Sequence, residues 1–314
     1  MEYKTIHLNK DELKSLTKLQ NQSFPKKRSF DYIYNKYDMS NFGVKPLGLF
    51  SIDKDEKPVA YYGVFPIQLK YDNKLIWVAQ SGDTMTHPNH RGKGLFMELA
   101  KSTYEICSQN QIELIFGFPN SQSYPGFIRL GWTFTDKWQH ISFRRKPFFI
   151  FKLLHRIPLF KSYFINRLRE DATVYEKSNW QEYLPDGVKG YIHKNEAYFD
   201  YKTKCSGAQI IEFEGFKLFL KIDSNLIIGD VSYFEAKRTT DFINCIKKLS
   251  KKYWCEGVIF QFSKNHWIYD YLKASNIIPQ ESNSAGNIGG IVLLDSNKIN
   301  VDKIMFVLSD TDFF

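Results

Sequence analysis

The sequence predicts an α/β protein with mixed sheets and helices packed against them. Strand-like runs of alternating or continuously apolar residues are interspersed with segments of helical periodicity, which is typical of this class. Hydrophobic residues make up 43% of the chain and aromatic residues 17%, enough for well-packed cores. The 314 residues also exceed the usual size of one domain, so two domains are expected.

The first 145 residues are predicted to follow the order β-α-α-β-β-β-α-β-α-β. Strands are expected at 2–7, 47–52, 58–70, 75–87, 112–118 and 133–145, and helices at 9–24, 29–38, 95–110 and within 119–132. Asn9 is the expected N-cap of the first helix. The DKDEK turn between the second and third strands indicates a hairpin.

The second half repeats part of this order. Strands are expected at 216–222, 226–234, 257–263 and 289–294, and helices at 238–253 and 266–276. The repetition indicates a duplicated architecture without matching sequence. We therefore predict a first domain at 1–145, a linker at 146–170 and a second domain at 171–314.

The linker, residues 146–170, is basic and apolar together and is interrupted by Pro158. One interpretation is a connecting segment with a helix packed on a domain. The other is a helix that binds a membrane surface or a partner, so peripheral membrane contact through this segment is left open.

Charge and cysteine content limit the function classes. The net charge is +9, which favours polyanionic partners, but the basic residues are spread along the chain and do not indicate DNA binding. The four cysteines form no CxxC pair and have no histidine at ligand spacing, which predicts free thiols and no metal site.

The charged N-terminal sequence resembles no signal peptide, and no run of apolar residues is long enough for a membrane span. A cytoplasmic protein is therefore expected.

A glycine-punctuated basic turn, THPNHRGKGLF, lies at residues 86–96 between a predicted strand and a predicted helix. Unpaired amides and the peptide dipoles at a helix N-terminus attract phosphate. Gly92 and Gly94 would let a ligand approach the backbone, and Arg91 and Lys93 would add positive charge. A basic loop that merely caps a helix would carry the same residues.

Two common phosphate loops do not fit this turn. GxxxxGK[ST] requires a hydroxyl residue after Lys93, where the chain has Gly94. GxGxxG requires a third glycine at the position of Met97.

The stretch Asn89-His90-Arg91-Gly92-Lys93-Gly94 resembles motif A of the GNAT acyltransferase superfamily, Gln/Arg-x-x-Gly-x-Gly/Ala. Both glycines match, and Asn89 departs from the first position. Downstream residues also fall at the family's intervals: Asn120, Ser123, Phe127, Gly131 and Trp132. The resemblance covers residues 1 to about 145. It implies a GNAT fold followed by a degenerate GNAT-like lobe, because the second half has no such turn.

The resemblance implies acetyl-CoA, or a related acyl-CoA, as co-substrate, and no metal. Pyrophosphate contacts would come from residues of the turn, namely Arg91, Gly92, Lys93, Gly94 and Leu95. The pantetheine arm would pair with the backbone of Thr84, Met85 and Thr86 in the manner of an added strand. Asn120 would lie near the same arm.

Two residues are catalytic candidates. The family position that often holds a thiolate-protonating tyrosine is Phe127, which cannot donate a proton, so Tyr124 is the nearest substitute. Pro125 and Gly126 argue against a regular helix there. Asp83 interrupts an apolar strand just before the expected pantetheine contacts, which suggests a base or an acceptor-binding group.

The predicted function is therefore N-acyl transfer from acetyl-CoA to an amine of a small molecule, such as an amino sugar or a sugar nucleotide. One alternative is a FemAB-like peptidyltransferase that uses aminoacyl-tRNA. Another is a CoA-binding module without catalysis. The sequence does not indicate the acceptor or the oligomeric state.

Overall fold

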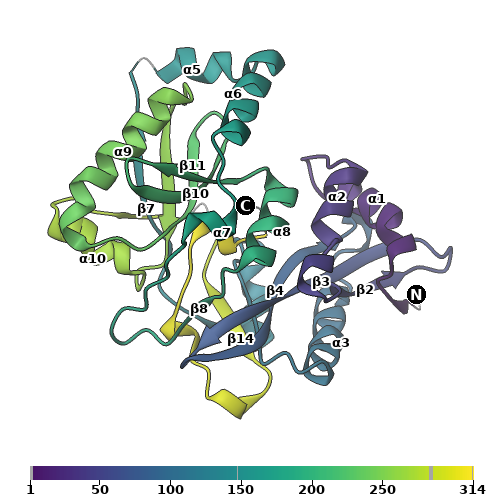
Figure 1. Ribbon diagram of the computed structural model, residues 1–314. Coiled ribbons are helices and arrows are strands. Elements are labelled where there is room, and N and C mark those ends of the chain that lie inside the picture. Colours follow the sequence, from purple (N-terminus) through teal and green to yellow (C-terminus); the bar gives the residue numbers. More distant parts are fainter. Residues whose placement is uncertain (1–2, 147, 283–285, 313) are drawn as a thin grey trace. The chain divides into compact units, whose positions relative to one another are not determined.

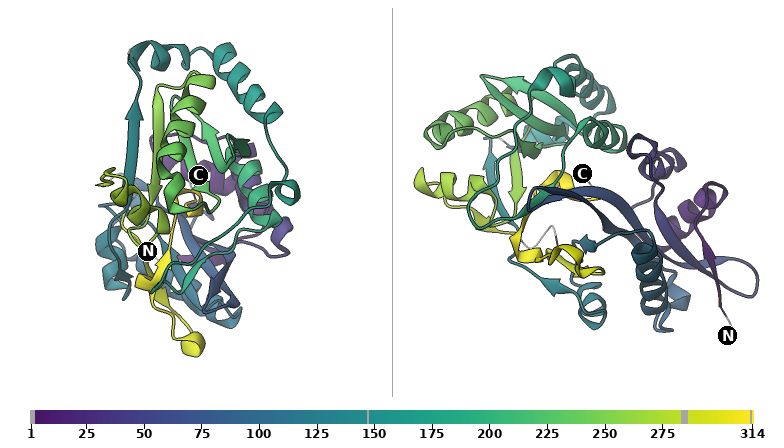
Figure 2. Two further views of the ribbon diagram at one scale, coloured as in Figure 1. Left: turned by 60° about the vertical axis from the view of Figure 1, so that its left-hand side comes forward. Right: turned by 60° about the horizontal axis from the view of Figure 1, so that its bottom comes forward.

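The computed structural model describes residues 3–146, 148–282, 286–312 and 314 (Figures 1 and 2). The chain forms two compact units. The first consists of residues 1–135 and 286–302, and the second of residues 136–285 and 303–314. Each unit contains its own sheet and core.

The first unit contains a sheet in the order β1-β2-β3-β4-β5-β14-β6. Its strands are β1 (Lys4–His7), β2 (Leu47–Ile52), β3 (Pro58–Tyr71), β4 (Lys74–Thr86), β5 (Leu114–Gly117), β6 (Thr133–Phe134) and β14 (Gly289–Val292). The first four strands pair antiparallel, whereas β4 and β5 are parallel. The crossover between these two parallel strands is a helix, α3, as parallel pairing requires.

Helices cover both faces of this sheet (Figure 2, right). They are α1 (Leu13–Ser23), α2 (Phe30–Tyr37), α3 (Leu95–Gln109) and α4 (Tyr124–Arg129), with short 3-10 turns η1 (Lys10–Glu12), η2 (Ser40–Phe42), η3 (Pro88–His90) and η5 (Asp295–Asn297). Asn9 caps the first turn through its side-chain oxygen, as predicted, and Ser29 caps α2 in the same way. On α3, the apolar stripe that includes Leu95, Leu99 and Tyr104 is buried against the sheet.

The second unit contains a sheet in the order β13-β7-β12-β11-β10-β9, and its strands β8 and β15 pair with each other in parallel. The strands are β7 (Gln139–Arg144), β8 (Gly190–Ile192), β9 (Gln209–Phe213), β10 (Phe216–Ile222), β11 (Leu226–Val231), β12 (Gly257–Phe262), β13 (Gln280–Glu281) and β15 (Ile304–Met305). Here too the parallel pair, β11 and β12, is joined by a helix, α9.

The helices of the second unit are α5 (Phe148–Leu154), α6 (Pro158–Glu170), α7 (Tyr175–Ser178), α8 (Glu196–Ser206), α9 (Thr239–Lys252) and α10 (Trp267–Ala274), with 3-10 turns η4 (Ala236–Arg238), η6 (Val301–Lys303, which begins in the first unit) and η7 (Leu308–Asp310). The amphipathic helix α9 buries Phe242, Ile246 and Leu249 in the core that also contains Phe260 of β12.

The two sheets share one arrangement of strands. In the first, β14 separates β5 from β6, and in the second, β7 separates β12 from β13. The strand in this place comes from the opposite half of the chain: β7, in the second unit, directly follows β6 of the first, and β14, in the first unit, follows β13 of the second. Each half of the chain therefore contributes one strand to the sheet built mainly by the other half, as two copies of a duplicated domain would after an exchange of their last strands.

This exchange changes two predicted strands. The strand predicted at 133–145 is split into β6 and β7, which belong to different units, and the strand predicted at 289–294 completes the sheet of the first unit. Backbone hydrogen bonds select these partners, and a strand's own sequence pattern does not reveal them. The compact units therefore do not follow the predicted boundaries 1–145, 146–170 and 171–314.

The other predicted elements are present with small shifts of their ends, and the structure adds elements that were not predicted, among them α7, β8, α8, β9, β13 and β15. A short regular helix, α4, does form at residues 124–129 despite Pro125, because proline is compatible with the first turn of a helix. The four cysteines are free, as predicted, and Cys107 and Cys245 are buried.

Replacement of Gly257 by alanine should destabilise the second unit. A methyl group there would overlap the carbonyl oxygen of Phe143 on β7, and backbone cannot move aside without breaking the β7–β12 ladder. We expect a loss of about 3 kcal/mol, the upper end for overpacking, in urea unfolding. Ser142→Ala, at an exposed position of β7, is the control and should change little; equal stability of both variants would contradict the pairing of β7 with β12.

Candidate functional site

The parallel strands β4 and β5 form a fork. Their pairing comprises Ala79 with Ile115 and Gln80 with Phe116 and ends there, and β5 itself ends one residue later at Gly117. β4 continues to Thr86 as the partner of β3. Within the described residues, the edge of β4 that faces β5 therefore has no partner strand beyond Gln80, and it can accept an extended ligand by main-chain hydrogen bonds.

A β-bulge lies on β4 within this fork. Gly63 faces Gly82 and Tyr61 faces Met85, so that Tyr62 alone faces both Asp83 and Thr84. Asp83 adopts a φ of +53°, in the left-handed region that aspartate tolerates better than most residues. A bulge bends its strand and re-aims the neighbouring side chains, which explains why Asp83 interrupts the apolar pattern.

The glycine turn leads from β4 into α3. Gly92 and Gly94 have φ values of +75° and +80°, and a Cβ at either position would meet nothing within 4 Å. Both glycines are therefore needed for backbone conformation and leave open space in front of the turn. The amides of Gly92, Gly94, Leu95 and Phe96 have no acceptor in the described part of the chain. These amides form a cradle that fits an anion.

The cations of the turn lie on its rim. Arg91 donates to the carbonyl oxygens of Thr86 at 3.3 Å and Ser23 at 3.4 Å, and its side chain is exposed. Lys93 donates to the hydroxyl of Tyr3 at 3.0 Å. These bonds connect the turn to residues near the N-terminus and hold two positive charges beside the cradle.

The remaining predicted contact residues occupy the fork or its vicinity. Thr84 and Thr86 are half-buried and Met85 is buried, so Met85 could reach a ligand only through its backbone. Asn120 is exposed after β5, and its side-chain oxygen accepts from the amides of Gln122 and Ser123. Its carboxamide thereby shapes the turn that leads into α4, a local role that the sequence did not predict.

Asp83 has two buried partners on α2. Lys36 donates to one carboxylate oxygen at 2.8 Å and the hydroxyl of Tyr37 donates to the other at 3.1 Å. The side chains of Lys36 and Asp83 are 5% and 12% exposed, so this ion pair is largely removed from water. Burial, with Asp83 next in effect, raises the pKa of Tyr37 well above its usual value. Sequence reasoning missed both partners, because they lie more than 40 residues away and resemble an ordinary amphipathic helix.

Tyr124 begins α4 and is half-buried, with its ring 4.4 Å from that of Phe134. Its hydroxyl has no hydrogen-bond partner among the described residues. Phe127 is buried against Phe96 and Tyr62, so it packs α4 onto the sheet. Asp83 lies on the opposite face, where Tyr37 packs on Tyr61. The structure therefore places the two catalytic candidates on opposite faces of the sheet.

A buried polar network supports the fork on the α3 side. Ser81 donates to the hydroxyl of Tyr62 at 2.9 Å, which lies 3.1 Å from the hydroxyl of Tyr104, and Trp132 donates to Tyr104 at 2.8 Å. Burial raises the pKa of Tyr104 to about 12, so these hydroxyls stay protonated. The network fixes Ser81 next to the last paired residue of β4.

The second unit has a corresponding fork, but its own chain fills it. Beyond the β11–β12 pairing, Val307 bridges to Phe262, and η7 packs against the ends of both strands. The ring of Phe314 occupies the space that a side chain at Gly229 would need. A ligand could enter this fork only if residues 306–314 moved out.

Asp230 of the second unit matches the position of Asp83. A bulge at Gly229 precedes it on β11, and Lys194 is its buried partner at 3.1 Å. Asp310 adds a second carboxylate 3.5 Å from the same ammonium group. Burial raises the pKa of Asp230 to about 6. The C-terminal segment thus closes over Asp230, which leaves it a structural residue and not an acceptor contact in this conformation.

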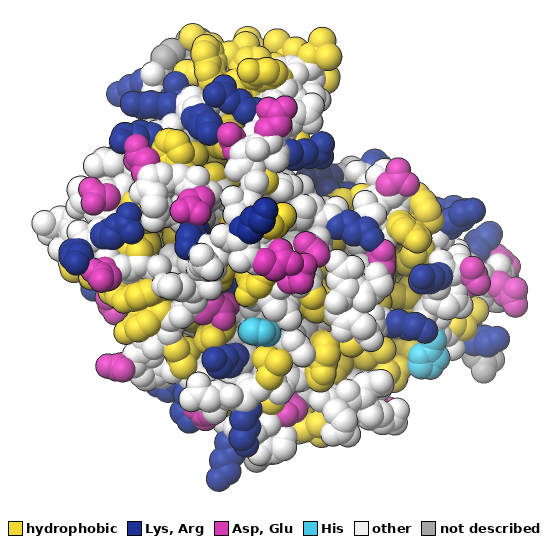
Figure 3. Space-filling model, in the orientation of Figure 1, with side chains coloured by type: hydrophobic (Ala, Val, Ile, Leu, Met, Phe, Trp, Pro, Cys, Tyr) yellow, Lys and Arg dark blue, Asp and Glu magenta, His cyan; other side chains and the backbone are white. Residues whose placement is uncertain are grey.

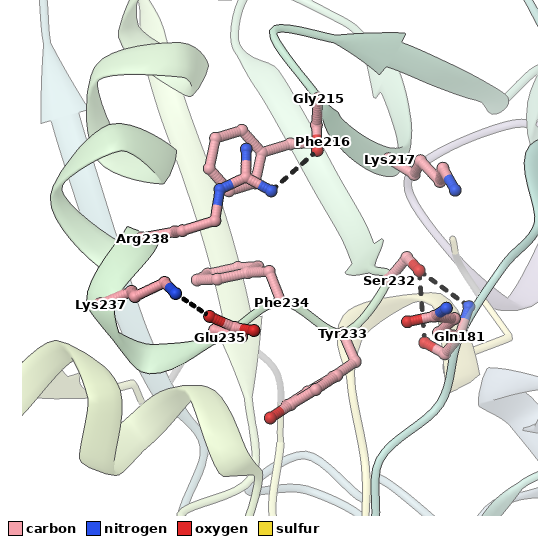
Figure 4. Close-up of a pocket in the computed structure, with 10 residues that line it drawn as sticks. All are labelled: Gln181, Gly215, Phe216, Lys217, Ser232, Tyr233, Phe234, Glu235, Lys237 and Arg238. Carbon is pink, nitrogen blue, oxygen red and sulfur yellow. Dashed lines mark hydrogen bonds and ion pairs between the residues drawn. The ribbon is translucent and has the colours of Figure 1, made fainter.

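A pocket of about 480 Å³ lies where β11 leads into η4 and α9 (Figure 4). It is lined by aromatic and charged residues, among them Phe216, Tyr233, Lys217, Lys237 and Arg238. The cations are already engaged: Arg238 donates to the carbonyl oxygens of Glu214 and Gly215, Lys237 pairs with Glu235, and Lys217 donates to Asn179. The glycine turn of the first unit, with its unbonded amides, is therefore the stronger anion site.

Comparison with known families identifies the first unit. A family profile described as an acetyltransferase (GNAT) domain matches residues 4–135. Residues 4–135 form a GNAT domain. The match ends at β6, so the family profile covers the glycine turn and the fork, and leaves out the second unit.

Solved structures share the fold over nearly the whole chain. A GCN5-related N-acetyltransferase from Kribbella flavida has a TM-score of 0.60 at 12% identity, covering 93% of this chain and 71% of that chain. A probable N-acyltransferase from Enterococcus faecalis V583 has a TM-score of 0.59 at 12% identity, covering 93% and 73%. A GCN5-related N-acetyltransferase from Anabaena variabilis reaches 0.57 at 11% identity, again covering 93% and 73%. No curated protein sequence matches the chain.

Two features, a metal-binding cluster and a membrane-spanning helix, are absent from the residues that the structure describes. No group of three or more histidine, cysteine or acidic side chains is placed to hold a metal ion. No helix in this part of the chain combines the length and apolar character that a membrane crossing requires.

The Lys36–Asp83 pair should be energetically coupled. Lys36→Met leaves a buried carboxylate without its cation and should cost about 3 kcal/mol in urea unfolding, while the double variant with Asp83→Asn should cost clearly less than the sum of the single variants. Additive effects would contradict a buried pair. The exposed pair Lys57–Asp55, with its charges 3.9 Å apart, is the control, and the same substitutions there should change stability little.

Proposed function

We propose that this protein is an acyl-CoA-dependent N-acyltransferase that transfers an acetyl group to the amine of a small molecule. The observation that carries the proposal is the glycine turn at the mouth of a splayed strand pair. Unbonded amides, two glycines at positive φ and a strand edge without a partner occur together in the first unit. They fit the two parts of CoA, a pyrophosphate and an amide-containing arm.

Each predicted contact residue has a place in this assignment. The amides of Gly92, Gly94 and Leu95 would bind the pyrophosphate, with Arg91 and Lys93 adding charge, whereas the amide of Arg91, also predicted to take part, donates to the carbonyl oxygen of Pro88 at 3.4 Å. Thr84, Met85 and Thr86 would pair through their backbone with the pantetheine arm, and Asn120 would lie near it. Acetyl-CoA supplies an activated acyl group on a thioester, and the chain's own residues must position the amine and manage the protons.

Asp83 is proposed to bind the amine of the acceptor. It lies on the bulge within the fork, so its carboxylate is close to the strand edge proposed for pantetheine. A carboxylate attracts a cationic amine, and the ion pair with Lys36 at 2.8 Å holds this one in place. Tyr37 holds the second oxygen and orients the carboxylate.

Tyr124 is proposed to protonate the departing sulfur. Its ring is held by Phe134 at the start of α4, and its hydroxyl makes no bond to the described residues. A hydroxyl that is positioned but not engaged by the protein can donate to a ligand. This role replaces the tyrosine that the family often carries at the position of Phe127.

The cradle favours acyl-CoA over the alternatives. An aminoacyl-tRNA-dependent reaction needs no pyrophosphate site of this kind, and its binding would weaken steeply with salt concentration. A CoA-binding module without catalysis would bind CoA but release no thiol when amines are present. The acceptor proposed from the sequence, an amino sugar or a sugar nucleotide, is to be identified by a screen of amines with thiol release as the readout.

Gly92→Val should abolish CoA binding without unfolding the domain. Valine strains a left-handed position and places a side chain in front of the cradle, so we expect a weakening of at least about 30-fold in calorimetry. Gly43→Val is the matched control: its φ is +67°, it also has nothing within 4 Å, and it lies away from the turn. Native protein should bind one CoA per chain, because the second fork is filled. Retention of CoA binding by Gly92→Val would refute the assignment.

Asp83→Asn and Tyr124→Phe should affect different kinetic constants. With a responsive amine, Asp83→Asn should raise the amine's KM about 10-fold or more and leave CoA affinity within two-fold. Tyr124→Phe should lower kcat about 10²-fold, the lower end for a lost general acid. If Asp83→Asn instead lowered kcat alone, Asp83 would act as a base, and unchanged kinetics in either variant would remove that residue from the site.

A further inference from the structure

Helices α5 and α6 attach to the second unit by one side only. Phe151, Phe164 and Leu168 are buried, and Phe164 and Leu168 belong to the core of the unit. His155 lies 3.1 Å from the carbonyl oxygen of Trp254 through its Nε2. These contacts fix the orientation of both helices, and they therefore determine which side chains of α5 and α6 face the solvent.

The outward side of these helices is apolar. Its exposed fractions are 84% for Leu159, 62% for Leu153, 59% for Tyr163, 48% for Ile157 and 42% for Ile150. We call these five residues the α5–α6 patch. In Figure 3 hydrophobic side chains gather at the top of the molecule, where Figure 1 labels α5 and α6. A helix on a protein surface normally turns polar residues to water, so apolar residues concentrated on this side indicate a contact surface.

Positive charge surrounds the patch. Residues 144–170 contain eight lysines and arginines and one acidic residue, a surplus of seven charges in a chain whose total is +9. Among the cationic side chains in this segment, those of Arg144, Lys146, Arg156 and Arg169 are exposed. Dark blue side chains lie next to the apolar ones in Figure 3. Basic residues occur along the whole chain, but most of the net charge comes from the segment that exposes this patch, which corrects the expectation that the excess is spread evenly.

The charge decides which occupant fits. A second copy of the chain placed patch to patch would oppose two strongly positive segments and be repelled. An anionic lipid surface attracts the cations with its headgroups and receives the aliphatic and tyrosine side chains at the boundary of its acyl chains. We propose that the α5–α6 patch binds the surface of an anionic membrane without crossing it.

This surface is independent of the proposed chemistry, because none of its residues belongs to the fork or to the glycine turn. Membrane binding and CoA binding can therefore succeed or fail separately. If both hold, the enzyme acts next to a lipid surface, and amines concentrated there are its accessible acceptors.

Vesicle flotation with the full chain tests the proposal. Wild type should float with vesicles of phosphatidylcholine containing 30% phosphatidylglycerol, and should bind at least about 10-fold more weakly to pure phosphatidylcholine. Leu153→Glu/Leu159→Glu should reduce binding to the anionic vesicles at least 10-fold. The matched control is Ile278→Glu, which changes an apolar residue that is 79% exposed elsewhere in the second unit, and it should bind like wild type.

A second variant separates charge from apolar contact. Arg156→Gln/Arg169→Gln keeps the patch and should weaken anionic binding about five-fold for each charge removed. Unchanged thermal unfolding verifies the fold of both double variants. Equal binding to both vesicle types, or wild-type binding by the Leu153/Leu159 variant, would overturn the proposal. So would a wild-type dimer in sedimentation velocity that this variant dissociates, if no vesicles are bound.

Discussion

The separation of β4 from β5 after Gln80 is the constraint on which the candidate site depends. Two parallel strands that stayed paired to their ends would leave no strand edge for a ligand. The bulge at Asp83 lies in the part of β4 whose edge on the β5 side has no partner strand. The Ser81–Tyr62–Tyr104 network fixes the residues just before this bulge. The glycine turn then follows directly, so one local departure from regular pairing positions both the strand edge and the anion cradle.

In the second unit, the protein's own C-terminal segment occupies the corresponding fork. It repeats the strand order, the parallel pair joined by a helix, a bulge next to a Gly-Asp pair and a buried lysine that faces the aspartate. Its fork, however, contains residues of the C-terminal segment, among them Val307 and Phe314. Asp83 and Asp230 thus have related surroundings but different access, and only the first lies at a fork that a ligand can reach without displacement of the chain.

Asp83 and Asp230 differ in their charged partners and in how far they are buried. Asp83 has one cation, Lys36, and one hydroxyl as partners, and 12% of its side chain remains exposed. Asp230 shares Lys194 with Asp310 inside the core, where burial, and after it the nearby Asp310 carboxylate, raise the pKa of Asp230 to about 6. The carboxylate of Asp83 is partly exposed and has one cationic partner, so it can exchange that partner for a ligand. The buried cluster of Asp230, Lys194 and Asp310 has no such access and mainly specifies how the C-terminal segment packs.

The sequence by itself determined the elements and the site that depends on local order. Strand, turn and helix follow one another at residues 75–110, so the glycines, the basic residues and the helix N-terminus had to come together, and the GNAT resemblance rested on the same stretch. Tertiary structure alone decided which strands from the two halves of the chain share a sheet, that Lys36 and Tyr37 meet Asp83, and that the C-terminal segment fills the second fork. These contacts join residues far apart in the chain, and local periodicity carries no information about which distant partner a strand edge or a buried charge will meet.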